Sequence, residues 1–158
     1  MNLAYLGLGS NLGDRAGHLL FALEALRPKR VSPFYETAPV GYLEQDPFLN
    51  CVCELETALS PWALLRELHR LEKLRQRERP FPNAPRTLDL DILLYSNLVL
   101  LSPRLTIPHP RLAERAFVVA PWADLRPAYR PLLAGLTGPQ IRRRDDGAAG
   151  ATVAPGPR

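Results

Sequence analysis

The alternation of apolar and polar positions predicts strands and helices in the order β-α-β-β-α-β. Strands are expected at residues 2–9, 31–37, 48–57 and 87–95. Apolar residues recur at the spacing of one helix face after the first strand (Leu19, Ala22, Leu23 and Leu26) and after the third (Leu64, Leu65, Leu68 and Leu71). This order fits a ferredoxin-like α+β sandwich, in which the helices cover one sheet face and leave the other available for a ligand.

The chain beyond this core is expected to add short strands around residues 96–103 and a helix over residues 111–124. We therefore expect one domain over residues 1–138. Residues 139–158 are rich in Gly, Ala, Pro and Arg, and this composition predicts a disordered tail.

The remaining composition favours a cytoplasmic protein without a membrane partner. No apolar run approaches the roughly 20 residues that cross a bilayer, and the N-terminal stretch lacks the basic start of a signal peptide. Cys51 and Cys53 are two positions apart, so on a strand they point to the same face. We expect both to be reduced and without chemistry, because this spacing is awkward for a disulfide.

Basic residues are concentrated in one segment. The chain has 20 Lys and Arg against 16 Asp and Glu, a net charge of +4. Residues 66–86 contain seven basic and three acidic residues, so this segment accounts for the whole excess. One positive zone indicates one polyanionic ligand, which is a nucleotide, another phosphate compound or a nucleic acid.

Two carboxylates share one face of the strand predicted over residues 87–95. Side chains alternate across a strand, so Leu88, Leu90, Ile92 and Leu94 are expected on one face and Thr87, Asp89, Asp91 and Leu93 on the other. Neighbouring carboxylates repel unless a cation offsets them, and Mg²⁺ takes one or two protein carboxylates together with phosphate oxygens. The alternative is a solvated pair on an exposed sheet face.

Arginines and a histidine flank this strand. Arg77, Arg79 and Arg86 precede it, and Arg clamps beside a metal suit phosphoryl-type transfer. The alternative is a basic helix end that favours the helix dipole. His109 lies between two prolines that hold its backbone, so its ring is a candidate donor to phosphate.

The stretch over residues 7–13 contains three glycines but does not match a phosphate-binding fingerprint, and we interpret it as a tight strand-to-helix turn. Phe48 and Phe117 are candidate stacking residues, although aromatic side chains more often belong to the core.

Four segments resemble 6-hydroxymethyl-7,8-dihydropterin pyrophosphokinases. They are Gly-Ser-Asn-Leu-Gly-Asp at 9–14, Phe-Tyr-Glu-Thr-Ala-Pro at 34–39, Pro-Arg-Thr-Leu-Asp-Leu-Asp-Ile-Leu at 85–93 and Leu-Thr-Ile-Pro-His-Pro-Arg-Leu at 105–112. The resemblance implies a monomeric enzyme of folate biosynthesis with a ferredoxin-like fold. It would transfer the β,γ-pyrophosphate of ATP to the pterin hydroxymethyl oxygen and release AMP.

The same resemblance implies roles for individual residues. Two Mg²⁺ ions would be held by Asp89 and Asp91, and catalysis would also use Arg77, Arg79 and Arg86. The ATP site would comprise Arg77, Arg86, Ile92, Arg104, Thr106, His109 and Arg115. The pterin site would comprise Thr37, Ala38, Val40, Phe48, Asn50, Asp89 and Phe117, with the ring stacked between the two phenylalanines.

The chain departs from the resemblance before the Pro-Arg pair. Asn83 and Ala84 occupy positions where relatives have an aromatic residue and a glycine, so a lid role for that aromatic residue has no counterpart here. The proline-rich loops at 38–47 and 76–85 are nevertheless expected to close over bound ATP.

Two other functions fit parts of the pattern. A ferredoxin-like sheet with a basic zone is typical of single-stranded RNA-binding modules, but the aromatic strand motif of those modules is missing, so we expect no nucleic-acid partner. A nuclease or an ordinary kinase would also use paired aspartates and arginines. The nucleotide product distinguishes the latter, because pyrophosphoryl transfer releases AMP and phosphoryl transfer releases ADP.

Overall fold

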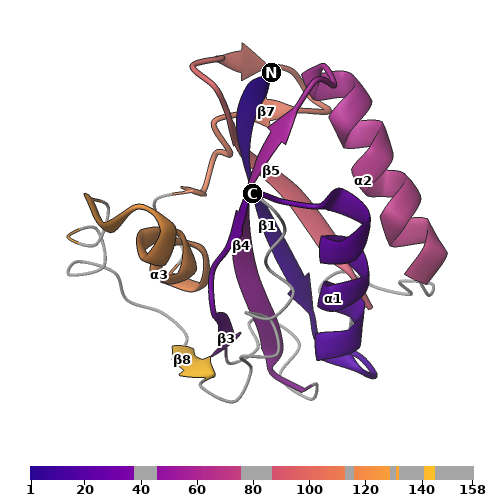
Figure 1. The fold of residues 1–158 in the computed structure, drawn as a ribbon, viewed down its shortest axis with the longest axis vertical. Coiled ribbons are helices and arrows are strands. Elements are labelled where there is room, and N and C mark those ends of the chain that lie inside the picture. Colours follow the sequence, from indigo (N-terminus) through magenta and orange to yellow (C-terminus); the bar gives the residue numbers. More distant parts are fainter. Residues whose placement is uncertain (38–45, 76–86, 113–115, 129–130, 132–140, 145–158) are drawn as a thin grey trace.

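The computed structural model describes residues 1–37, 46–75, 87–112, 116–128, 131 and 141–144, which form a β-sheet with helices on both faces (Figure 1). The elements along the chain are β1 (Asn2–Ser10), α1 (Arg15–Leu26), β2 (Arg30–Val31), β3 (Phe34–Thr37), β4 (Phe48–Thr57), α2 (Pro61–Arg75), β5 (Asp89–Tyr95), β6 (Leu100–Leu101), β7 (Thr106–Ile107), α3 (Ala116–Leu125) and β8 (Ile141–Arg144).

The described part of the chain forms a six-stranded sheet with the order β5-β1-β4-β3-β8, in which β2 pairs with β4 off this path, and a two-stranded sheet of β6 and β7. β1 pairs antiparallel with β4 and β5, and β4 pairs antiparallel with β3. β4 therefore lies between β1 and β3, the strands on either side of α1 in the chain. This is the split βαβ arrangement of the ferredoxin-like fold, which confirms the predicted fold class.

The second predicted strand is divided into β2 and β3 at Ser32 and Pro33. The Ser32 N–H donates to the Val52 carbonyl oxygen at 2.9 Å, and its Oγ accepts from the Val52 N–H at 3.0 Å. Proline has no N–H to give to a ladder, so regular pairing stops here and the serine side chain supplies a replacement.

The helices α1 and α2 cover one sheet face, as predicted for the βαββαβ core (Figure 1). The residue before each helix has a side chain that accepts a hydrogen bond from a backbone N–H of the first turn. Asp14 accepts from the Gly17 N–H at 3.0 Å, and Ser60 Oγ accepts from the Ala63 N–H at 3.1 Å. The main core lies beneath them and includes Leu6, Leu8, Leu19, Leu23, Leu64, Leu68, Leu71, Leu88, Leu90 and Ile92.

The additional helix α3 lies against the opposite sheet face (Figure 1). A second apolar cluster joins it to three strands through Tyr5, Val52, Leu93, Val118, Trp122 and Leu125. The helix expected from residue 111 thus exists but begins at Ala116. Its packing leaves only part of this face for a ligand.

A bulge in β5 changes the predicted faces of its last residues. Leu6 pairs with Ile92, but Tyr5 pairs with Leu94, so β5 has one extra residue at Leu93. Leu94 therefore packs with the α3-side cluster, whereas alternation had placed it on the α1 and α2 side. The aspartates precede the bulge and keep their predicted face.

Residues 141–144 correct part of the expectation of a disordered tail. They form β8, which pairs antiparallel with β3 from Phe34 to Thr37. The outer edge of β3 offers backbone groups that a strand satisfies, and composition alone does not reveal such a long-range partner. The domain limit at residue 138 stays a prediction.

The two cysteines behave as the sequence indicates. Cys51 and Cys53 are buried free thiols on the core face of β4. Burial raises the pKa of Cys53 to about 12 and raises that of Cys51 well above its ordinary value, so both stay protonated. Among the described helices, none is long and apolar enough to cross a membrane.

Candidate active site

One row across the sheet brings the candidate metal and pterin residues to the same face. Asp89 pairs with Gly9, Gly9 pairs with Asn50, and Asn50 pairs with Tyr35. Directly paired residues point to the same side of a sheet, here the side that α3 partly covers. Gly9 adds no side chain between the aspartate of β5 and the asparagine of β4.

The glycines of this row correct one sequence interpretation. Gly7 and Gly9 belong to β1 and not to a turn, while Gly13, with φ of 71°, belongs to the turn before α1. The signal for Gly9 was available in the sequence, because a glycine inside a strand pattern often marks a close approach of another group.

The Asn50 side chain is held in one orientation. Its Nδ2 donates to Thr37 Oγ1 at 3.1 Å, and both residues are buried. A Cβ at Gly9 would lie 2.7 Å from Asn50 Oδ1, closer than real contacts allow. The orientation of the Asn50 amide thus depends on the hydrogen bond to Thr37 and on the absence of a side chain at Gly9. The second N–H of the amide takes no part in the hydrogen bond to Thr37.

The aspartates stand side by side on half-buried positions of β5. Asp89 and Asp91 pair with Gly9 and Gly7, and their Cα atoms are about 6.6–6.8 Å apart by strand rise. Within the described residues no group of three or more His, Cys, Asp or Glu is arranged to hold a metal. One or two carboxylates together with substrate phosphate oxygens are a donor set that suits Mg²⁺.

A glutamate of α2 fixes the strand between the two aspartates. Glu72 Oε2 accepts from the Leu90 N–H at 2.7 Å. β5 is an edge strand of the described sheet, so the backbone N–H of Leu90 would otherwise lack a strand partner. Sequence reasoning missed this support. Its signal was an acidic residue directly after the buried Leu71 of the same helix.

The segment after β7 places His109 beside β5. The His109 N–H donates to the Leu93 carbonyl oxygen at 2.9 Å. Its Nδ1 accepts from the Arg111 N–H at 3.2 Å, so the neutral ring carries its proton on Nε2. His109 is therefore attached two residues beyond Asp91, which brings a candidate hydrogen-bond donor to phosphate to the strand of the two aspartates.

The other described candidates for the ATP site differ in how far their side chains are exposed to solvent. Ile92 is buried in the core on the side of α1 and α2, so only its backbone can face a ligand on the aspartate side. Thr106 is half-buried, and its Oγ1 donates to the Ser102 carbonyl oxygen at 3.2 Å. Arg104 is exposed on the turn between β6 and β7.

Several predicted site residues lie outside the described residues. They are Ala38, Val40, Arg77, Arg79, Arg86 and Arg115, together with the side chain of Phe117. The departure at Asn83 and Ala84 lies outside them too, as does most of the two expected lid loops. Phe48 is described, and it begins β4 opposite Thr37.

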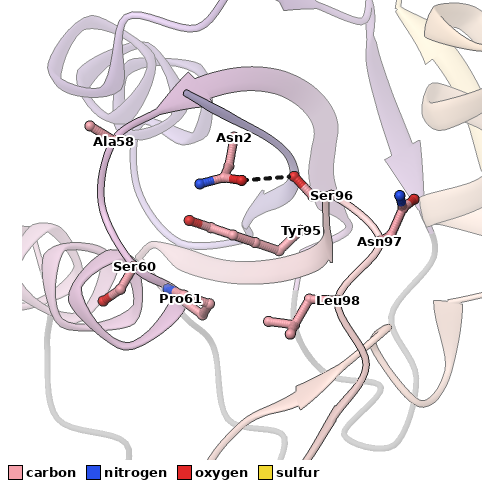
Figure 2. A pocket seen from close by; sticks show the side chains of 8 residues that line it. All are labelled: Asn2, Ala58, Ser60, Pro61, Tyr95, Ser96, Asn97 and Leu98. Carbon is pink, nitrogen blue, oxygen red and sulfur yellow. Dashed lines mark hydrogen bonds between the residues drawn. The ribbon is translucent and has the colours of Figure 1, made fainter.

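A hollow of about 610 Å³ lies at the other end of the sheet (Figure 2). Asn2, Ser60, Ser96, Asn97 and Leu98 are among the residues that line it. Asn2 and Gly9 are seven positions apart on β1, which corresponds to roughly 23 Å by strand rise. The lining contains none of the candidate site residues, so this hollow is separate from the acidic pair.

Comparisons with known proteins match most of this chain to a protein family. The model of the 7,8-dihydro-6-hydroxymethylpterin-pyrophosphokinase (HPPK) family matches residues 5–127. The chain is 43% identical over 130 residues to a 2-amino-4-hydroxy-6-hydroxymethyldihydropteridine pyrophosphokinase of Bacillus subtilis, an alignment that covers 78% of each protein. It is 39% identical over 132 residues to the folic acid synthesis protein FOL1 of Dictyostelium discoideum, covering 81% of this chain but 20% of that relative.

Solved structures support the fold. A crystal structure of Plasmodium falciparum HPPK-DHPS with pterin and p-hydroxybenzoate is similar with a TM-score of 0.60 at 16% identity, covering 78% of this chain and 38% of that chain. The chain thus spans most of the Bacillus relative but a small part of the larger proteins. The sequence match and the shared fold lead to one conclusion: this chain belongs to the HPPK family and catalyses pyrophosphoryl transfer to hydroxymethyldihydropterin in folate biosynthesis.

Proposed function

We propose that ATP is the pyrophosphoryl donor, that Mg²⁺ is required, and that AMP is the second product. A bond forms between the pterin hydroxymethyl oxygen and the β-phosphorus of ATP. The bond from that phosphorus to the oxygen bridging to the α-phosphorus breaks, AMP leaves with that oxygen, and the hydroxyl proton is lost. The observation that carries this proposal is the row in which Asp89 and Asn50 flank Gly9 on one face.

The metal requirement is supported by the donor set. Asp89 and Asp91 offer hard oxygen ligands on one side of a strand, and bound Mg²⁺ would neutralise charge on the transferred phosphates. We propose two ions, shared between these carboxylates and ATP. Glu72 keeps the two aspartates in register by binding the backbone N–H between them.

The remaining roles divide between the two substrates. Asn50, oriented by Thr37, would pair with the polar edge of the pterin, and a wrong ring edge would leave this amide unpaired at a cost of about 1–3 kcal/mol. His109 would donate its Nε2–H to a phosphate. We also propose the predicted roles of Arg77, Arg79, Arg86 and Arg115 at the phosphates and of Phe48 and Phe117 at the ring.

We further propose a monomeric, cytoplasmic enzyme with a domain over residues 1–138, to whose sheet β8 adds a strand, and closure of loops 38–47 and 76–85 over ATP. The free, buried cysteines suit a reducing compartment. Loop closure is tested by amide exchange with and without an ATP analogue, Mg²⁺ and pterin. Unchanged exchange in both loops would reject closure.

The decisive experiment is incubation with ATP, Mg²⁺ and the reduced pterin alcohol, followed by chromatography of the nucleotides. AMP is expected, whereas ADP would reject pyrophosphoryl transfer from ATP. Asp91→Asn keeps the size of the side chain and removes its charge, so it is expected to lower turnover by about a hundredfold or more. The matched control is Glu56→Gln, which removes an exposed carboxylate that pairs with Lys29 at 3.3 Å and should leave turnover unchanged.

A further inference from the structure

Two tyrosine hydroxyls from different strands bind the C-terminal end of α3, one through Asp124 in its last turn and one through Arg126 directly after the helix. The Tyr35 hydroxyl of β3 donates to Asp124 Oδ2. The Tyr5 hydroxyl of β1 accepts from Arg126 Nη1 at 3.0 Å. Both tyrosines are buried, with 8% of the surface of Tyr35 and 3% of that of Tyr5 exposed, whereas Asp124 is half-buried and Arg126 is exposed.

The Tyr5 contact belongs to a larger charged network. Its hydroxyl donates to Glu54 on β4, and Arg30 on β2 binds the same carboxylate through two hydrogen bonds of 2.9 and 3.0 Å. Trp122 of α3 also meets the Tyr5 ring edge-on at 6.4 Å between centroids. The helix is therefore attached to a side-chain arrangement that spans β1, β2 and β4.

These contacts are close to the candidate pterin row. Tyr35 pairs in register with Asn50, and Thr37, two residues further along β3, accepts from the Asn50 amide. At its other end, α3 continues from the segment that His109 attaches to β5. Phe117 belongs to the first turn of α3, so the placement of this helix determines the position of the Phe117 backbone.

The apolar contacts between α3 and the sheet are not directional. Val118, Trp122 and Leu125 pack on Val52 and Leu93, and such burial tolerates small shifts along the interface. Hydrogen bonds lose strength with distance and angle, so the two hydroxyls select one position of the helix among those that bury the same area.

We propose that Tyr5 and Tyr35 are positioning residues for the pterin: their hydroxyls set α3 in the place that completes the pterin site. This inference rests on the proposed function. It concerns residues that touch the helix and not the reacting atoms, so it predicts a selective effect on the pterin and little effect on ATP.

The test removes single hydroxyls and follows steady-state kinetics together with the melting temperature. Tyr35→Phe and Tyr5→Phe are each expected to raise KM for the pterin about five- to tenfold, with KM for ATP unchanged and kcat nearly unchanged. Tyr95→Phe is the matched control. It removes a buried hydroxyl that donates to the Leu59 carbonyl oxygen at the far end of the sheet, so it should lower the melting temperature without moving either KM.

A second pair of variants keeps the test valid where a tyrosine variant fails to fold. Asp124→Asn retains an oxygen that accepts from Tyr35 and should keep the wild-type KM for the pterin, whereas Asp124→Ala should raise it as Tyr35→Phe does. Unchanged KM values in Tyr35→Phe and Asp124→Ala, with a loss of melting temperature like that of Tyr95→Phe, would overturn the inference. Failure of the wild-type protein to form AMP would instead reject the proposed function.

Discussion

Replacing Gly9 by alanine tests whether the bare position between Asp89 and Asn50 controls pterin binding. The added Cβ would lie 2.7 Å from Asn50 Oδ1 and 3.8 Å from the Leu49 carbonyl oxygen, so the Asn50 amide must move first. The amide is bound to Thr37 Oγ1 at 3.1 Å, and a rotation that relieves the clash breaks this hydrogen bond.

The magnitude follows from what the buried amide loses. A buried polar group left without its partner costs about 1–3 kcal/mol, which corresponds to a loss of pterin affinity of roughly five- to 150-fold. Overpacking adds a loss of stability of about 1–3 kcal/mol. The affinity is measured by titration of the protein with the pterin in the presence of Mg²⁺ and an ATP analogue, and the stability is measured by urea unfolding.

Gly7→Ala is the matched control, because Gly7 lies two residues earlier on the same strand and face. A Cβ there would lie 3.5 Å from Leu93 Cδ2, an ordinary van der Waals contact, so pterin affinity and stability should change little. The reasoning is refuted if Gly9→Ala binds the pterin as tightly as the wild-type protein, or if both alanine variants lose the same affinity.

Two further changes address the supports of the site and of α3. Glu72→Ala removes the acceptor of the Leu90 N–H and should shift the strand that carries the two aspartates. The Mg²⁺ concentration needed for half-maximal AMP formation should therefore rise about tenfold. An unchanged Mg²⁺ requirement would contradict this role of Glu72. The pKa of Glu54 lies below its ordinary 4.5, and the largest cause is the hydrogen bond from Arg30. Burial acts in the opposite direction, and the hydrogen bond from the Tyr5 hydroxyl lowers the pKa further. The unfolded state therefore binds more protons than the folded state in this pH range. The contribution of Glu54 to the free energy of unfolding is present above its ordinary pKa and is lost as the pH falls through its pKa in the folded protein. Urea unfolding between about pH 5 and 3 should show a steeper loss for the wild-type protein than for Glu54→Gln, and parallel pH curves would argue against the network.

Local patterns were enough to predict most of the elements. The strand expected at 48–57 is β4, and the helix expected after Ser60 begins at Pro61 because serine caps and proline at the first turn are local signals. The shared face of Asp89 and Asp91 also follows from alternation, and the register with Gly9 and Gly7 confirms it.

What the sequence could not provide depends on partners that lie far apart along the chain. The extra residue at Leu93 is defined only against the register of β1, so alternation assigned Leu94 to the wrong face. The pairing of residues 141–144 with β3 depends on an available edge and not on composition. Glu72 became visible as a support only once α2 was packed beside β5.

Apart from Asp89, which the resemblance assigns to both sites, the side chains proposed for metal and pterin belong to different elements, and β1 contributes only hydrogen atoms at Gly7 and Gly9 between Asp89 and Asn50. Substitutions at Asn50 should therefore affect recognition of the pterin more than Mg²⁺ binding by the aspartates. Substitutions on β4 are expected to alter which alcohol is accepted while the metal ligands on β5 remain intact. This division makes the scaffold a practical starting point for redesigning acceptor choice by changing one strand at a time.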